Sequence, residues 1–388
     1  MDRVRIIMLV IFSFLFLYSL IFYPLTLLLL SLFYKKNVNK DDNYKISVSL
    51  IILACNEEDN IEKKILNSLS LNYPKEKLEI IIASESSDKT NEITSRYIKQ
   101  GVILDAYNTK LGKVETMRRA VKKATGEIVI FSDSDVIYDK EAVAMIVRNY
   151  ADKRIGAVCG RLKYLLSDSD HVGILEGVRW SYENFIKRLS SNIFSLDVAN
   201  GPIFSVRKDY YYPIGYKRGD DQELPVMVLI KGKGSIFENE AIGYEQHIAS
   251  FKVELYKKVR IVHWMLPSSL VLLYKALKCK RFFIAFQLFS HKINRWLSPF
   301  WLIGITISAF FLKNTIYGKL VCMGILIFVG CIFLGYLADR LNSKLLNYFY
   351  PFYYFYILNL ASFMGVIKIL LRHDIPWHSA SEDNKQKH

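Results

Sequence analysis

Cysteines are few in this 388-residue sequence, and acidic residues are outnumbered by basic ones. The five cysteines form no C-x-x-C pair and no even framework, which excludes a disulfide-built scaffold and indicates reduced thiols of a cytosolic compartment. Zinc-finger spacing, a helix-turn-helix signal and an arginine-rich arm are all absent, so nucleic acid is not an expected partner. The sequence also lacks internal repeats and low-complexity stretches.

The shortage of acidic residues leaves 52 Lys and Arg against 37 Asp and Glu, a formal net charge of +15. Such an excess suits nucleic acid, anionic lipid headgroups or phosphorylated substrates. Hydrophobic residues make up 52% of the chain and concentrate at its two ends, which indicates a membrane protein. We therefore expect membrane lipid as the first partner and a nucleotide substrate as the second.

Two apolar regions flank the middle of the chain. Residues 1–36 form an expected transmembrane anchor, because the apolar run 6–33 is too long for a signal-peptide core and has no small-residue cleavage site. Residues 265–296 mix apolar and basic side chains, as amphipathic interface helices do, and residues 297–371 form expected C-terminal transmembrane helices. The segment 297–312 is short for a span, at about 24 Å of helix, so a re-entrant segment is an alternative.

The expected topology is that of a multi-pass protein of the cell membrane. Lys35 and Lys36 follow the apolar run 6–33, which favours a cytosolic position for the domain after the anchor. The residues 372–388 form a polar tail. Residues 45–264 alternate apolar strand patterns with amphipathic helix patterns, which predicts an α/β domain with a mostly parallel, Rossmann-like sheet.

The segment Asp133-Ser134-Asp135 is the most informative local feature. It ends the apolar run 127–132, so the two carboxylates lie at the carboxyl end of a buried strand, where open α/β sheets place their ligands. Two hard oxygen donors one residue apart suit Mg²⁺ or Mn²⁺ that is also held by a substrate's phosphates. A turn followed by a helix N-cap is the alternative interpretation.

Several other patches combine with this one: Leu53-Ala54-Cys55-Asn56-Glu57-Glu58, residues 83–90, Lys110-Leu111-Gly112-Lys113, residues 199–207 and Gly219-Asp220-Asp221-Gln222-Glu223-Leu224-Pro225. Together they resemble the family-2 glycosyltransferases, inverting enzymes with a GT-A fold that use nucleotide sugars. The resemblance covers roughly residues 48–295. The membrane layout is similar to that of the branch with hyaluronan, poly-N-acetylglucosamine and cellulose synthases.

The resemblance implies a donor site along the strand ends. It places Ala54 and Glu57 near the nucleotide base, Glu85 on the base or ribose, Lys113 on the diphosphate, and Asp133 beside the donor. It also implies that Asp133 and Asp135 bind Mg²⁺ or Mn²⁺. The patch at residues 83–90 departs from the family pattern, since Glu85 replaces the usual Asp and the turn is one residue shorter. As an alternative, the Asn-Glu-Glu and Asp88 positions are helix-capping signals.

For the acceptor side, the resemblance implies that Asn200, Gly201 and Pro202 lie against the acceptor sugar. It makes Asp221 the general base, Asp220 its tuning neighbour, and Arg260 the cation that neutralises the leaving diphosphate. A turn at 200–202 and a helix N-cap at Asp221 are the alternatives. In the family's Q-x-x-R-W segment only Arg260 matches, because Lys257 and Ile261 replace Gln and Trp, which counts against long processive synthesis.

The implied activity is metal-dependent transfer of a hexosyl or N-acetylhexosaminyl group, with a UDP-sugar as the expected donor. The acceptor is a polysaccharide, slightly favoured by the helix layout, or a lipid-linked glycan. A polyprenyl-phosphate glycosyltransferase remains an alternative, and so does a non-catalytic membrane scaffold or sugar sensor on a transferase fold.

Overall fold

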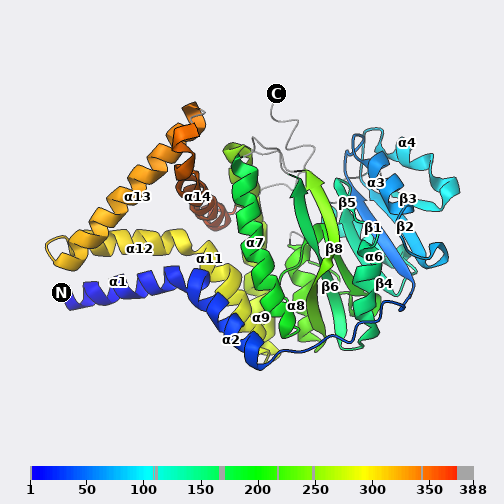
Figure 1. The fold of residues 1–388 in the computed structure, drawn as a ribbon, viewed down its shortest axis with the longest axis horizontal. Coiled ribbons are helices and arrows are strands. Elements are labelled where there is room, and N and C mark those ends of the chain that lie inside the picture. The colour runs from blue at the N-terminus through cyan, green and yellow to red at the C-terminus, as the bar shows by residue number, and fades with distance from the viewer. Residues whose placement is uncertain are drawn as a thin grey trace.

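An eight-stranded sheet organises the middle of the chain in the computed structural model, which describes residues 2–107, 109, 112–165, 171–215, 218–246, 250–341 and 344–373 (Figure 1). The strand order is β3-β2-β1-β4-β7-β6-β8-β5. The strands are β1 (Val48–Ala54), β2 (Leu78–Ser84), β3 (Val102–Ala106), β4 (Ile128–Asp133), β5 (Val136–Tyr138), β6 (Ile155–Leu165), β7 (Phe204–Arg207) and β8 (Gly234–Gln246).

The sheet is mostly parallel, as predicted. Strands β3, β2, β1 and β4 are parallel neighbours, β6 pairs in parallel with β8, and β7 and β5 are the antiparallel additions. Leu53 of β1 pairs with Asp133 of β4. The carboxyl ends of β1, β2 and β4 therefore meet at one edge of the sheet, where ligands of open α/β sheets bind.

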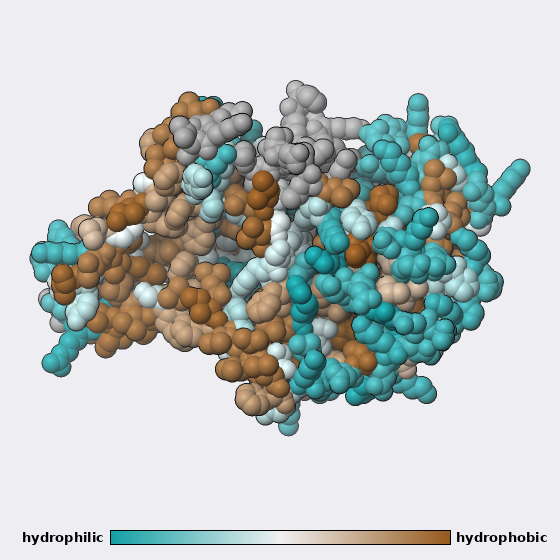
Figure 2. Space-filling view, in the orientation of Figure 1, coloured by the Kyte–Doolittle hydropathy of each residue, from teal (hydrophilic) through white to brown (hydrophobic). Residues whose placement is uncertain are grey.

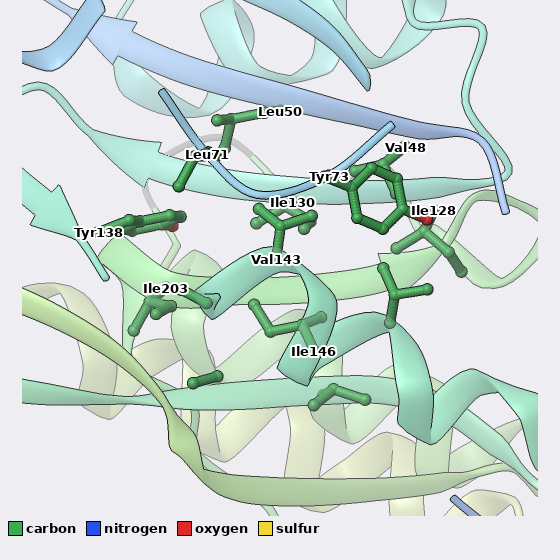
Figure 3. Packing of buried hydrophobic residues seen from close by; sticks show 14 of the residues in the cluster. Val48, Leu50, Leu71, Tyr73, Ile128, Ile130, Tyr138, Val143, Ile146 and Ile203 are labelled. Carbon is green, nitrogen blue, oxygen red and sulfur yellow. The ribbon is translucent and has the colours of Figure 1, made fainter. Parts of the chain in front are cut away.

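Buried aliphatic side chains on both faces hold the sheet. All seven residues of β1 are buried, as in a parallel strand covered by helices on both sides. Leu50 and Ile130 pack on one face with Val143 and Ile146 of a covering helix (Figure 3), while Ile51 packs on the other. Each such side chain contributes about 1.5–3 kcal/mol of transfer free energy, so the strand end that carries the acids is a rigid support.

Seven helices of the described part surround the sheet: α3 (Ile61–Leu69), α4 (Thr90–Ser95), α5 (Lys113–Lys123), α6 (Ala142–Val147), α7 (His171–Asn192), α8 (Asp220–Ile230) and α9 (Phe251–Lys278). Single 3₁₀ turns occur at Lys75–Lys77, Ile98–Gln100, Arg148–Ala151, Gly201–Ile203, Lys208–Tyr210 and Lys344–Phe349. Helix α4 ends at Ser95, because the chain tightens into a 3₁₀ turn before Gly101, which has φ 92°.

The apolar helices extend from one side of the sheet domain (Figure 1). They are α1 (Asp2–Leu17), α2 (Tyr23–Phe33), α10 (Phe282–Gln287), α11 (Asn294–Trp296), α12 (Ser298–Phe311), α13 (Ile316–Leu341) and α14 (Tyr350–Leu370), with π-helical turns at Tyr18–Phe22 and Leu288–Ile293. By length and composition, Asp2–Phe33, Ile316–Leu341 and Leu346–Leu370 suffice to cross a membrane. Their hydrophobic surface contrasts with the hydrophilic sheet domain in Figure 2.

Helix α12 runs beside α1 over nearly its whole length. Near one end of the pair, the Asn294 amide just before α12 donates to Ser19 Oγ at 2.6 Å. At the other end, the Arg5 guanidinium lies 5.2 Å from the Phe311 ring. The short helix therefore reaches the level at which α1 begins, which disfavours the re-entrant alternative for residues 297–312.

One helix belongs to both parts of the molecule. Helix α9 has 28 residues and continues through Pro267, so the boundary expected between residues 264 and 265 falls inside it. Its first half packs along α14, with Phe251 and Leu255 against Tyr354. Its second half packs on α8 and α10 through Leu272 and Ala276. The sequence pattern changes within the helix, although the helix itself does not end.

A buried ionic cluster ties α7, α9 and α14 together. Glu176 of α7 is 1% exposed and accepts from Lys258 of α9 at 2.6 Å and from the Tyr354 hydroxyl of α14 at 2.5 Å. Arg179, one turn along α7, makes a bidentate ion pair with the same carboxylate. A buried carboxylate with this many donors joins three helices at one point.

Glu176→Gln should destabilise the fold by about 3 kcal/mol, because it leaves buried Arg179 without its carboxylate and removes one of the two carboxylates of Lys258, which also pairs with Glu254 at 2.6 Å. Chemical unfolding of the detergent-solubilised protein measures this. The matched control is Glu92→Gln, whose carboxylate pairs with Arg96 at 2.8 Å on the surface and should change stability by less than about 1 kcal/mol. Equal stability of the two variants would contradict the assigned role of Glu176.

Candidate functional site

Two carboxylates meet at the carboxyl edge of the sheet. Asp133 is the last residue of β4, and Asp135 directly precedes β5. Because β5 pairs antiparallel with β8, Val136 lies opposite Glu245. This pairing brings Glu245, which the sequence analysis did not select, to the same acidic edge.

The edge concentrates negative charge. Burial, then the neighbouring Asp133, raises the pKa of Asp135. Burial is also the main cause that raises the pKa of Glu57 to about 7 and that of Glu245 to about 8, with Asp135 adding to both. Neighbouring carboxylates whose pKa values are raised in this way repel one another when ionised, so binding of a cation among them is favourable.

The donor chemistry fits Mg²⁺ or Mn²⁺. Asp133 and Asp135 offer hard carboxylate oxygens, the ligand type that both ions prefer. Within the described residues, no group of three or more His, Cys, Asp or Glu is arranged to hold a metal ion. A bound ion would therefore complete its coordination with water and with a phosphate-bearing ligand, as Mg²⁺ commonly does.

Lys113 connects this edge to a second pair of acids. Its Nζ lies 3.1 Å from Asp133 Oδ1 and 3.7 Å from Asp220 Oδ2. Burial alone would lower the pKa of Lys113, but the Asp133 and Asp220 carboxylates outweigh it and raise the pKa above its ordinary value. The lysine is therefore a fixed positive charge. Lys110 and Leu111, the first half of the predicted turn, lie outside the described residues.

Glu85 supports the helix that carries Lys113. Its Oε2 accepts from the Gly112 N–H at 2.9 Å, and its Oε1 accepts from the Thr116 hydroxyl at 2.5 Å. Gly112 has φ 88°, a left-handed conformation that glycine adopts without strain. The side chain predicted to contact the nucleotide thus makes hydrogen bonds that position α5. Its backbone N–H donates to the Ala54 carbonyl at 3.1 Å, so Ala54 and Glu85 lie together at the strand ends.

Helix α8 presents the second acid pair. Gly219 is the N-cap and Asp220 the first helical residue, and no side chain caps this end. Asp221 therefore lies in the first turn and is not the cap, which removes the support for the capping alternative. A Cβ on Gly219 would lie 1.9 Å from Met265 Sδ, so glycine here allows α9 to pack directly against the start of α8.

The Asp221 carboxyl is tuned by its surroundings. Burial and the neighbouring Asp220 raise its pKa to about 6, against the opposing charges of Lys113, Lys292 and Lys187. A carboxyl with a pKa near 6 holds a transferred proton better than an ordinary aspartate, yet it is ionised at neutral pH. These are the properties of a general base.

The segment from Ala199 to Pro202 passes directly in front of these acids. The Ala199 N–H donates to the Asp221 carbonyl at 2.7 Å. A Cβ on Gly201 would lie 3.8 Å from each of three atoms, Asp220 Oδ2, Asp221 Cβ and Lys113 Nζ. Gly201 therefore leaves open the space where the two acid pairs converge.

The two flanking residues of this segment have structural bonds. The Asn200 side-chain amide donates to the Gly160 carbonyl at 2.7 Å, and its oxygen accepts from Lys187. The Pro202 carbonyl accepts from the Tyr138 hydroxyl at 2.8 Å. Their side chains and carbonyls hold the segment in place, and the open position belongs to Gly201.

Two lysines that the sequence analysis did not select face the site. The charge of Lys257 on α9 acts on Asp135 and on Glu245, and Arg260 lies one turn further along the same helix. Lys187 on α7 acts on Asp221. The sequence marked Lys257 only as the residue that replaces a family glutamine. For Lys187 there was no sequence signal beyond its position in a helical pattern.

A cavity of about 310 Å³ opens at Asp221 and continues between the helices. Its lining comes from α1, α7, α9, α14 and the turns that follow α10. Asp221 thus lies at the meeting point of the acidic edge and a passage toward the membrane helices.

Part of the chain matches a known protein family. Residues 49–215 match the family described as Glycosyl transferase family 2. The Staphylococcus aureus (strain MSSA476) poly-beta-1,6-N-acetyl-D-glucosamine synthase is 26% identical over 263 residues, or 66% of this chain and 58% of the synthase. The match therefore spans less than two thirds of that relative. The probable glycosyltransferase YdaM of Bacillus subtilis (strain 168) is 24% identical over 382 residues, 88% of each chain.

A solved structure shares the whole architecture. The mannosyltransferase PcManGT from Pyrobaculum calidifontis, in complex with GDP-Man and Mn²⁺, superposes with a TM-score of 0.72 over 95% of this chain and 99% of its own. At 17% identity this likeness shows the fold, a GT-A domain with attached apolar helices. Residues 49–215 thus form a glycosyl transferase family 2 domain, within a chain that has a GT-A fold.

Proposed function

We propose that the chain is an inverting glycosyltransferase that moves a sugar from a nucleotide-diphosphate sugar, a UDP-sugar, to a glycan or lipid-linked acceptor at the membrane. One observation carries the proposal: Lys113 lies within 3.7 Å of both Asp133 and Asp220. A single side chain thus joins the edge suited to a donor diphosphate with the acid pair suited to activating an acceptor.

The reaction needs one displacement at the sugar C1 and no enzyme nucleophile, in contrast to retaining transfer. Asp221 accepts the proton of the attacking hydroxyl, and the charge of Asp220 helps to raise the pKa of Asp221. Lys113 and the α9 cations Lys257 and Arg260 counter the charge that develops on the departing diphosphate. A divalent ion held by Asp133 and Asp135 would supply further Lewis-acid stabilisation of that charge.

The related proteins support a transferase and leave the sugar to experiment. The printed name of one relative is that of an N-acetylglucosamine polymer synthase, and the fold neighbour is a mannosyltransferase with GDP-Man and Mn²⁺. Transfer of an N-acetylhexosaminyl or hexosyl group is consistent with both. A non-catalytic scaffold would not need Asp221 to retain a raised pKa beside a fixed lysine, so we favour the enzyme.

Purified protein should turn over a nucleotide sugar in the presence of Mn²⁺ or Mg²⁺, and Asp135→Asn should lose metal-dependent donor binding while keeping its fold. The reason is that Asp135 lies at the rim of the sheet. A screen of UDP- and GDP-sugars for nucleotide release, with calorimetry of UDP plus Mn²⁺, measures both. The exposed Asp59→Asn is the matched control. Unaltered metal-dependent UDP binding by Asp135→Asn would refute the metal assignment.

Asp221→Asn should lower turnover by about 10²–10⁴-fold, the usual cost of losing general-base catalysis. Donor KM should change little. In the wild type the pKa of Asp221 is raised to about 6, so the ionised base is present above this pH and is lost below it. Transfer should therefore fall as the pH decreases through about 6. The control is Asp209→Asn, an exposed residue; a turnover of Asp221→Asn within threefold of that control would leave Asp221 without a catalytic role.

We further propose that the sheet domain is cytosolic, because Lys35, Lys36 and the basic stretch 275–281 flank it. A cysteine at exposed Glu92 should resist a membrane-impermeant maleimide added to intact cells. A cysteine at Asn314, after α12, should react, since α12 ends beside the start of α1. The parent protein corrects for native thiols. The reverse labelling pattern would invert the proposed topology.

A further inference from the structure

The cavity at Asp221 does not extend to the ends of the membrane helices that lie away from the sheet domain. Its apolar part is lined by Phe16 of α1, by Leu20 of the π-helical turn Tyr18–Phe22, and by Phe355 and Leu358 of α14. The rings of Phe16 and Phe355 meet edge-on at 6.1 Å. Among the described residues, α12 contributes only Ser298 and α13 contributes none. The cavity therefore does not follow the membrane helices to their other end, as a channel for a growing polymer would.

The opposite part of the same cavity is strongly charged. Five cations line it, namely Arg179, Lys187, Lys258, Lys292 and Arg295, against two carboxylates, Glu183 and Asp221. Apolar walls on one side and charged walls on the other suit an amphiphile better than a uniformly polar glycan.

Four of the five cations have carboxylate partners. Arg179 and Lys258 pair with Glu176. Lys292 and Arg295 pair with Glu183 at 3.4 Å and 2.5 Å. Each of these four cations therefore has a carboxylate within ion-pair distance.

Lys187 differs from the other four. It is 2% exposed, its Nζ donates to the neutral Asn200 amide oxygen, and it lies 4.9 Å from the Trp180 ring centre. No carboxylate of the described residues lies within ion-pair distance of it. Burial lowers the pKa of Lys187 against the charges of Cys159, Glu183 and Asp221, which raise it. A buried ammonium without a counterion is costly, so an anion that enters the cavity would be bound there.

We propose that the cavity binds the acceptor as a saccharide linked to a lipid through phosphate. The phosphate faces Lys187, the lipid lies against Phe16, Leu20, Phe355 and Leu358, and the sugar hydroxyl reaches Asp221. In the transfer step, the hydroxyl oxygen forms a bond to the donor C1 and its proton passes to Asp221. The C1–O bond to the diphosphate breaks, and its electron pair leaves with the nucleotide. This inference rests on the proposed function and narrows its acceptor to one class.

The test compares three acceptors with full-length protein in detergent: farnesyl-diphosphate-linked N-acetylglucosamine, farnesyl N-acetylglucosaminide without phosphate, and a free N-acetylglucosamine tetramer. We expect kcat/KM for the phosphate-linked acceptor to exceed both others at least tenfold. A preference for the free tetramer would make the cavity a glycan site and overturn the proposal, as would equal use of the two lipids.

The variant Lys187→Gln should raise KM for the phosphate-linked acceptor about tenfold more than it raises KM for the uncharged lipid. Lys187→Arg should restore most of the loss because it keeps the charge. The control Arg188→Gln changes the next residue of α7, which is exposed. A Lys187→Gln variant with wild-type KM for the phosphate-linked acceptor would refute the role of Lys187.

Two further arms separate the possible causes of failure. Inorganic phosphate at the concentration of the acceptor should not inhibit transfer. Equal inhibition of transfer to both lipid acceptors would mean that Lys187 binds a free anion, and would reject the binding of a lipid-linked phosphate there. Donor hydrolysis without acceptor reports on the transferase itself. Hydrolysis without the acceptor preference refutes only this inference, whereas absence of hydrolysis and transfer with every donor refutes the proposed function.

Discussion

The charge of Lys113 between Asp133 and Asp220 is the constraint on which the site depends. It joins the end of β4 to the start of α8, two elements 87 residues apart in sequence, and it offsets repulsion between acids that would otherwise separate. The position of Lys113 is in turn set by Glu85 through Gly112 and Thr116. Buried ion pairs add little net stability, but removing one partner is costly, so such a bridge serves mainly to fix geometry.

Much of the fold could be predicted because its signals are local. Continuous apolar runs predicted β1 and β4, and the acids after β4 marked its carboxyl end. Boundaries that depend on tertiary surroundings were harder to predict. Composition changes near residue 264, yet α9 continues to Lys278, since tertiary contacts hold both halves, the first with α14 and the second with α8 and α10. Helix α4 is shorter than its pattern because a 3₁₀ turn leads the chain into Gly101.

Part of the candidate site follows from residues that are close together in the sequence. Asp133 and Asp135 are separated by one residue and Asp220 and Asp221 are adjacent, so both pairs could be selected from the sequence. The positions of Lys187 and Glu245 arise from long-range contacts, of α7 with Asn200 and of β8 with β5, which no local pattern encodes. Glu85 shows the converse: its position was predicted, but its hydrogen bonds to α5 depend on a helix that begins 28 residues later.

The close approach of Gly219 to Met265 connects the acid pair Asp220 and Asp221 mechanically with the apolar helices. Helix α9 presses against the start of α8 with one half and packs along α14 with the other. A bilayer that is too thin or too thick tilts the helices within it. We therefore expect lipid acyl-chain length to alter the rate of the proposed transfer. A fragment that ends at residue 264 would lack Met265 and the second half of α9, which support the start of α8 and the proposed base Asp221.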